Sequence, residues 1–229
     1  KLHDREPFNL IRIGDGEGRV LAYPKEISRH MMNRHLHFWF GRTDFSDKDI
    51  MRMRSDLISA ILYADVLGFS PNPKNRFWEH GADYAKSAAI ARGKDTCSIN
   101  LHIEMWRESH LGAIFKEADK IMLISCRNVV PEFSSRYGAQ VNWIRVPEEA
   151  NTGRRQTTHY HQEYDGIRKM IKKKGDGWLY LVGAGILGKV YCHDAKRAGN
   201  IALDIGSLFD GWAGISSRSF MGDMDNWRL

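Results

Sequence analysis

Two carboxylates separated by one glycine stand near the start of the chain, in the segment Arg12-Ile13-Gly14-Asp15-Gly16-Glu17. Paired in a turn, Asp15 and Glu17 can converge on a hard divalent cation such as Mg²⁺ or Mn²⁺, which then bridges to a diphosphate. Such a cation stabilises the charge that grows on a leaving phosphate when a glycosyl bond breaks. The plain alternative is an ordinary turn at Asp15-Gly16, with Glu17 as the first exposed residue of a helix.

A glycine motif, Gly183-Ala184-Gly185-Ile186-Leu187-Gly188-Lys189, stands near the other end and follows an apolar run. Asp204 lies 21 residues after Gly183, which matches the fingerprint of dinucleotide-binding folds. Those folds need several strand–helix units after this one, whereas 25 residues follow Asp204. We therefore predict a phosphate site at a helix N-terminus, where free amides and the helix dipole favour anions. Two alternatives stay open: an NAD(P)- or S-adenosylmethionine-binding enzyme of permuted order, and glycines that serve close helix–strand packing.

Apolar runs and helical patterns alternate along the chain, which predicts a mostly parallel α/β sheet with helices on both faces. The run Ile121–Ile124 is typical of a strand covered on both sides. The predicted strands are Asn9–Ile13, Val66–Phe69, Thr96–Asn100, Lys120–Ser125, Val141–Val146, Trp178–Val182 and Ile201–Ile205. The predicted helices are one from a capping box at Ser46–Asp49 to about Tyr63, and others near Gly81–Arg92, Trp106–Ala118, Thr158–Lys173 and Gly188–Ala198. We predict one Rossmann-like domain over residues 1–229; since residue 1 is not methionine, excision from a larger protein is the accompanying hypothesis.

The carboxyl ends of parallel strands face one crevice, so the two motifs are expected to meet over a single anionic ligand. Arg12 is expected either to reach a phosphate or to hold Asp15 or Glu17 through a bidentate pair. Arg127 follows another apolar strand, where it can contact the ligand or stabilise a turn. For Lys189, in the first turn of a helix, we expect contact with the diphosphate rather than exposure to solvent.

A hydroxyl that attacks a sugar with inversion must lose its proton, which requires a general base. The candidates, all expected in loops at this edge, are Glu104, Glu148, Glu149 and His159. Spacing does not distinguish among them. Two H-x-H pairs, His35/His37 and His159/His161, would each share one side of a strand, but neither has a third ligand at zinc spacing.

Composition narrows the class of protein. The formal charge of +6 and the pI near 9.2 favour anionic partners, but the densest basic run, in 168–174, has no interleaved aromatic residues. We therefore expect no nucleic-acid partner. No apolar run approaches the roughly 18 residues of a membrane span, and no signal-peptide core is present, so we expect a cytoplasmic protein, with peripheral association at the inner membrane face as a hypothesis.

The absence of G-x-S-x-G, P-loop and H-E-x-x-H motifs argues against a hydrolase, a P-loop kinase or a zinc protease.

Three segments together resemble the GT-D fold glycosyltransferases of bacterial surface-polysaccharide and glycoprotein assembly: 12–17, 180–189 and Ala202-Leu203-Asp204-Ile205-Gly206-Ser207. The resemblance spans nearly the whole chain, but no family motif is matched from Asn72 to Arg155. It implies a hexosyltransferase-like enzyme whose D-x-E motif holds a divalent metal and a nucleoside-diphosphate sugar. Carried over by position, Asp15 and Glu17 form the metal and diphosphate site and are the catalytic candidates. Gly14 and Arg12 join them, and the implied phosphate side comprises Gly183, Gly185, Gly188 and Lys189, with Asp204 to Ser207 closing the pocket.

The sequence thus predicts a metal-dependent glycosyltransferase that moves a sugar from a nucleoside-diphosphate sugar to a glycan acceptor. A lipid-linked acceptor is compatible with the basic surface. The remaining alternatives are the NAD(P)- or S-adenosylmethionine-binding enzyme and a catalytically silent binding domain of a larger assembly protein.

Overall fold

The computed structural model describes residues 6–42, 44–149, 159–218 and 221–229. Its centre is one sheet of seven strands in the order β3-β2-β1-β7-β6-β4-β5, and every neighbouring pair is parallel. The strands are β1 (Phe8–Ile13), β2 (Val66–Phe69), β3 (Asp95–Ser98), β4 (Lys120–Ser125), β5 (Gln140–Arg145), β6 (Leu179–Gly183) and β7 (Ile201–Asp204). All seven predicted strands are present within two residues of their predicted bounds. The predicted parallel α/β fold is confirmed.

Helices cover both faces because the strand side chains alternate between two apolar clusters. Along β4, Met122 and Ile124 enter one cluster, whereas Ile121 and Leu123 enter the other. The first cluster packs beneath α1 (Asp15–Ala22), α2 (Arg29–Phe40), α3 (Asp47–Leu62), α4 (Arg76–Arg92), α8 (Tyr164–Lys173) and α9 (Gly185–Arg197). The second packs beneath α5 (Leu101–Arg107), α6 (His110–Lys116), α7 (Val130–Tyr137), α10 (Leu208–Trp212) and the 3₁₀ helix η3 (Met224–Trp227).

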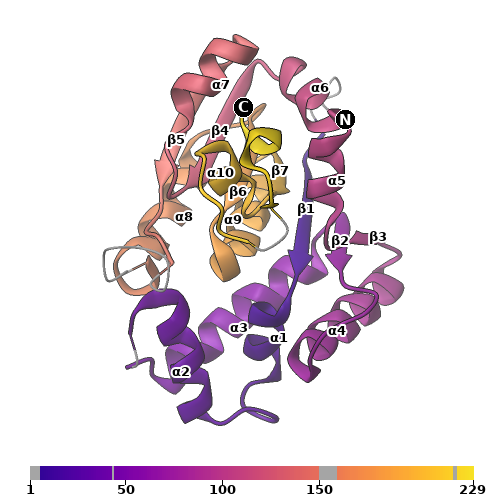
Figure 1. Ribbon diagram of the computed structural model, residues 1–229. Coiled ribbons are helices and arrows are strands. Elements are labelled where there is room, and N and C mark those ends of the chain that lie inside the picture. Colours follow the sequence, from indigo (N-terminus) through magenta and orange to yellow (C-terminus); the bar gives the residue numbers. More distant parts are fainter. Residues whose placement is uncertain (1–5, 43, 150–158, 219–220) are drawn as a thin grey trace.

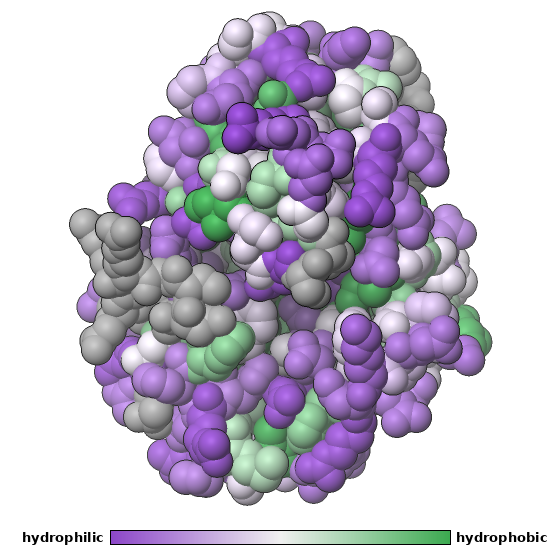
Figure 2. Space-filling model, in the orientation of Figure 1, coloured by the Kyte–Doolittle hydropathy of each residue, from purple (hydrophilic) through white to green (hydrophobic). Residues whose placement is uncertain are grey.

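Figure 1 shows β1 running towards α1, with α1 to α4 gathered beyond its carboxyl end. The C-terminal helix α10 lies in front of the sheet in this view. Hydrophilic residues dominate the face in Figure 2, where hydrophobic patches are small and separate. Within the described residues, no helix is both long enough and apolar enough to cross a membrane.

Several helices differ from the prediction in extent, for local reasons. The capping box at Ser46 and Asp49 is confirmed as the start of α3. Asn75 accepts hydrogen bonds from two amides of the following turn, so α4 starts five residues before the predicted Gly81. The helix predicted over Trp106–Ala118 is two helices, because Ser109 adopts a left-handed φ of 62° between them. Thr158, the predicted start of another helix, lies outside the described residues.

Two differences alter the predicted site. Helix α9 begins at Gly185, three residues before the predicted Gly188, so most of the glycine motif belongs to its first turn. Helix α2 was not predicted at all, yet it carries residues that cover the site.

Candidate active site

A cavity of about 310 Å³ lies at the carboxyl edge of the sheet, where β1, β4, β6 and β7 end. The two sequence motifs meet there as expected. Ten of the eleven predicted site residues line this cavity: Arg12, Gly14, Asp15, Glu17, Arg127, Gly183, Gly185, Lys189, Asp204 and Ser207. Gly188 does not, and a side chain there would press on Val182 of β6, with its Cβ 3.3 Å from Val182 Cγ1. Gly188 therefore serves helix–strand packing, one of the alternatives that the sequence left open.

Two helix N-termini open into this cavity. The first backbone hydrogen bond of α1 joins Gly18 N to Gly14 O at 3.0 Å, and the first of α9 joins Gly188 N to Ala184 O at 3.2 Å. The three amides that precede each bond have no intrahelical acceptor, and both helix dipoles place their positive ends here. Paired N-termini of this kind favour a ligand with more than one negative charge.

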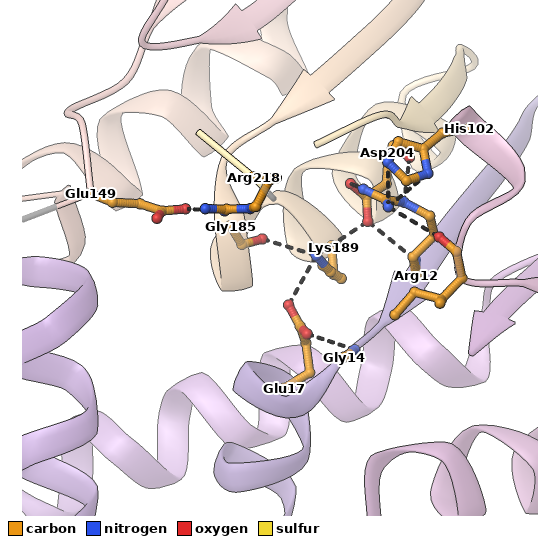
Figure 3. A network of polar contacts seen from close by, with 10 residues as sticks. Arg12, Gly14, Glu17, His102, Glu149, Gly185, Lys189, Asp204 and Arg218 are labelled. Carbon is orange, nitrogen blue, oxygen red and sulfur yellow. Dashed lines mark hydrogen bonds and ion pairs between the residues drawn. The ribbon is translucent and has the colours of Figure 1, made fainter. Parts of the chain in front are cut away.

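Lys189 joins the two motifs through its buried ammonium group (Figure 3). Its Nζ lies 2.9 Å from Glu17 Oε1 and 3.2 Å from Asp204 Oδ2, and it donates to Gly185 O at 3.1 Å. Burial lowers the pKa of Lys189, but the two adjacent carboxylates outweigh this effect and hold the pKa above its usual value. Lys189 is therefore protonated, and the two carboxylates balance its charge within this buried cluster.

Arg12 is bound to Asp204 rather than to Asp15 or Glu17. Its Nε donates to the Asp204 carbonyl oxygen at 2.9 Å and its Nη2 to Oδ1 at 3.1 Å, while its backbone amide donates to Oδ2 at 3.1 Å. Its Nη1 contacts Ile99 O and a ring nitrogen of His102. Burial, with the nearby Arg12 charge, lowers the pKa of His102 to about 2, so this ring is neutral. The arginine thus anchors β1 to the end of β7.

These contacts occupy the carboxylate of Asp204 on both oxygens. Burial raises its pKa, but the charges of Arg12 and Lys189 outweigh burial and lower the pKa to about 2. The dinucleotide fingerprint requires an acidic side chain that is available to a ribose hydroxyl. Because Asp204 is enclosed by two cations, the structure argues against that alternative.

We expected the Asp15-Gly16-Glu17 segment to be a separate turn, but it forms the first turn of helix α1. Glu17 is buried and accepts the Gly14 amide at 2.8 Å in addition to its ion pair with Lys189. Asp15 is half-buried and lines the cavity, and its side chain has no hydrogen bond or ion pair to another described residue. Within the described chain, no three His, Cys, Asp or Glu side chains gather to hold a metal. The residues fit a divalent cation that binds Asp15 and the ligand's own phosphates, an arrangement common for Mg²⁺.

Trp39 of α2 covers the middle glycine of both motifs, a role that sequence reasoning missed. A Cβ on Gly16 would lie 3.2 Å from its Cζ2, and one on Gly185, which has a φ of +53°, would lie 3.1 Å from its Cζ3. Its indole nitrogen is buried and lacks a hydrogen-bond partner within the described residues. Gly183 is packed more tightly still, because a Cβ there would lie 2.5 Å from Phe209 Cδ2 and 2.7 Å from Gly206 O.

The lining of the cavity also contains a second cation that is paired with carboxylates. Arg127 donates through Nη1 to Glu148 and through Nε to Asp210, both at 2.7 Å, and Asp210 also accepts from Ser217 at 2.6 Å. Asp210 was not predicted from the sequence, since no motif marks it. Arg127 is thus positioned by two acidic side chains at the cavity wall.

The four candidate general bases differ in whether they line the cavity. Glu148, Glu149 and His159 line the cavity, whereas Glu104 is in α5 and does not. His159 is buried in a π-helical turn and bonded to Tyr191 at 2.8 Å; burial lowers its pKa to about 3. Burial raises the pKa of Glu149, whose Oε1 lies 3.5 Å from Arg218 Nη2.

The H-x-H pairs, expected on strands, are helical. His35 and His37 lie in α2, and His159 and His161 in the π-helical turn η1.

The parallel sheet, with two helix N-termini at its carboxyl edge, defines a Rossmann-like protein. A family model described as a GT-D fold-like domain matches residues 1–212, so the chain belongs to this family and is a glycosyltransferase of the GT-D type. No curated protein sequence matches the chain.

Three solved structures share the fold, each at 15% sequence identity. A selenomethionine-substituted domain of unknown function 1792 has a TM-score of 0.56, with 90% of this chain and 75% of that chain covered. A domain 1792 structure described as having a distinct glycosyltransferase fold has a TM-score of 0.51 with the same coverage. A domain 1792 glycosyltransferase from Streptococcus sanguinis has a TM-score of 0.52, with 93% and 80% covered.

Proposed function

We propose that this glycosyltransferase takes its sugar from a nucleoside-diphosphate sugar whose diphosphate binds between the N-termini of α1 and α9. The convergence of two helix N-termini and the Lys189 ammonium on one cavity is the observation that supports this proposal. Amides at both ends can donate to phosphate oxygens, and the positive ends of the two helix dipoles stabilise the charge that grows on the departing diphosphate.

A divalent cation, Mg²⁺ or Mn²⁺, would be held by Asp15 and would add Lewis-acid stabilisation to the diphosphate. Glu17 would act through Lys189, because its carboxylate is already committed to that ammonium and to the Gly14 amide. Lys189 and Glu17 are therefore positioning residues, because their ion pair fixes the two helix N-termini relative to each other.

Glu149 is our candidate for the general base. Its carboxylate lies at the cavity wall, and the raised pKa makes it a stronger base than an ordinary glutamate. In the transfer step the acceptor oxygen bonds to the anomeric carbon, its proton passes to the Glu149 carboxylate, and the bond from that carbon to the diphosphate oxygen breaks. The diphosphate leaves with the bonding electron pair.

We further propose that the domain spanning residues 1–229 serves bacterial surface-polysaccharide or glycoprotein assembly at the cytoplasmic face of the membrane. The family membership and the basic composition support this assignment. Flotation with anionic liposomes at low salt tests the location, since a protein that works at this surface should float with them and be released by salt.

Calorimetric titration with UDP, GDP, CDP and dTDP, each with and without Mn²⁺, tests the donor site. We expect one nucleotide to bind tightly and to need the metal. Titration with NADH, monitored through NADH fluorescence, tests the dinucleotide-binding alternative. Saturable NADH binding without Mn²⁺, in a protein that binds none of the four nucleotides, would refute the donor proposal.

A further inference from the structure

A second cavity, of about 590 Å³, adjoins the first and shares four lining residues with it: Asp15, Trp39, Glu149 and Arg218. Its other lining residues are Arg19, Met31, Arg34, His35 and Phe38. A group bound in this cavity would thus face the proposed metal ligand Asp15 and the proposed base Glu149 from the side away from the sheet. Sugar transfer requires such an arrangement, because the acceptor hydroxyl must reach both the donor sugar and the base.

Helix α2 presents two apolar faces, and the fold uses one of them. Met32, Leu36 and Phe40, spaced four residues apart, are buried in the core. Met31 and Phe38, seven residues apart, line the second cavity and are 43% and 48% exposed. Large apolar side chains that surround a cavity and remain this exposed are typical of a ligand site.

The second cavity also has an excess of positive charge. Arg19 and Arg34 line it, and neither has an acidic partner within the described residues. Arg19 stacks on the ring of Phe77, with its guanidinium carbon 4.5 Å from the ring centre, and its buried Nε has no hydrogen-bond acceptor there. Unpaired guanidinium groups beside an apolar surface recognise a phosphate that is attached to an apolar group.

We propose that the second cavity binds the acceptor, and that this acceptor carries a phosphate group beside an apolar chain. The inference rests on the proposed function, since it places the acceptor next to the donor cavity. Arg34 and Arg19 would hold the phosphate, Phe38 and Met31 would contact the chain, and the sugar would extend past Trp39 towards Glu149.

Octyl phosphate, used below the concentration at which it forms micelles, is the probe for this site. We expect calorimetry to detect its binding to the wild-type chain, whereas inorganic phosphate and uncharged octyl glucoside each bind far more weakly. Arg34→Glu and Phe38→Ser should each weaken octyl phosphate binding about tenfold or more, as expected for the loss of a charge-assisted or an apolar contact. Both residues are solvent-exposed on α2, so the variants should fold.

Matched control variants lie on the exposed face of α4. Lys86→Glu makes the same change of charge as Arg34→Glu, and Ile90→Ser removes an exposed apolar side chain as Phe38→Ser does. Both controls should bind octyl phosphate as the wild type does. The proposal is overturned if octyl phosphate does not bind, if it binds equally to the α2 variants, or if inorganic phosphate binds as tightly.

Nucleotide titration of the same variants separates this inference from the donor proposal. The α2 variants should retain wild-type affinity for whichever nucleoside diphosphate binds in the presence of Mn²⁺. Absence of nucleotide binding in every protein would refute the donor site while octyl phosphate still reports on the second cavity. Normal nucleotide binding with no octyl phosphate binding would refute the acceptor site alone.

Discussion

The Lys189 ammonium lies 2.9 Å from the Glu17 carboxylate, and this contact joins the two motifs that stand near opposite ends of the chain. Glu17 lies in the first turn of α1, which follows β1, and Lys189 lies near the start of α9, which follows β6. Strands β1 and β6 lie on either side of β7. Asp204, from the end of β7, completes the cluster at 3.2 Å from Lys189. The cluster therefore fixes the relative positions of the two helix N-termini that form the proposed diphosphate site.

Replacement of Lys189 by methionine should destabilise the fold. It removes the cation and leaves Glu17 and Asp204 buried without it, a situation that typically lowers the free energy of unfolding by about 3–5 kcal/mol. Urea unfolding measures the change. Adding Glu17→Gln to this variant should recover part of the loss, because the uncompensated charge is then removed. An unfolding midpoint for Lys189→Met equal to that of the wild type would contradict this account of the cluster.

The two carboxylates of the D-x-E segment should differ in their effect on metal dependence. Asp15→Asn should abolish the enhancement of nucleotide binding by Mn²⁺ with little change in stability, since Asp15 is half-buried and has no ionic partner within the described residues. Glu17→Gln should lower stability and keep that enhancement. Calorimetry with and without Mn²⁺ gives one result and urea unfolding the other. Equal loss of metal dependence in both variants would show that Glu17 is also a metal ligand.

Because of the ion pairs of Asp204, the free energy of unfolding should decrease at low pH. Its pKa of about 2 in the folded protein lies below the ordinary value near 4, so the unfolded chain binds its proton first as the pH falls. The stabilisation is present above pH 4 and is lost as the pH falls from about 4 to about 2. The stability gap between the wild type and Asp204→Asn should narrow by about 2 kcal/mol over this interval, measured by urea unfolding at each pH. A constant gap would contradict the assignment.

Gly18 should not tolerate alanine. A Cβ there would overlap the Phe77 carbonyl oxygen, because α1 and α4 approach each other closely at this point. Forcing the helices apart should lower stability by about 1–3 kcal/mol or more. Gly166 in α8 is the control, since a Cβ there meets nothing within 4 Å, and Gly166→Ala should raise stability by about 0.5–1 kcal/mol. Thermal unfolding of the two variants should therefore shift in opposite directions.

The sequence predicted the sheet well because its central strands, such as β4 and β6, contain apolar runs bounded by polar or glycine residues. It also predicted which loops would meet, since parallel strands place their carboxyl ends on one edge. Helix boundaries were less accurate where a local signal was weak. The bend at Ser109 depends on one left-handed residue whose side chain gives no sign of it.

The sequence predicted which residues line the cavity, but it did not predict which side chains contact each other. Which partner Arg12 or Glu17 takes depends on how β7 and α9 sit beside β1, and spacing along the chain carries no such information. Trp39 could not be assigned for the same reason, because α2 is brought over the glycines by tertiary packing alone. The D-x-E segment predicted two equivalent ligands, whereas the fold gives its two carboxylates different surroundings.

The role of Glu149 as general base predicts a specific pH profile. Burial raises its pKa above the ordinary value for glutamate, so transfer should fall on the acidic side at a higher pH than an exposed glutamate would give. Glu149→Gln should lower kcat by about 10²- to 10⁴-fold and remove this acidic limb, while nucleotide affinity stays unchanged. Glu132→Gln, on the exposed surface of α7, should keep the wild-type profile. If the Glu149→Gln variant retains both its rate and its acidic limb, the proton must pass to another group.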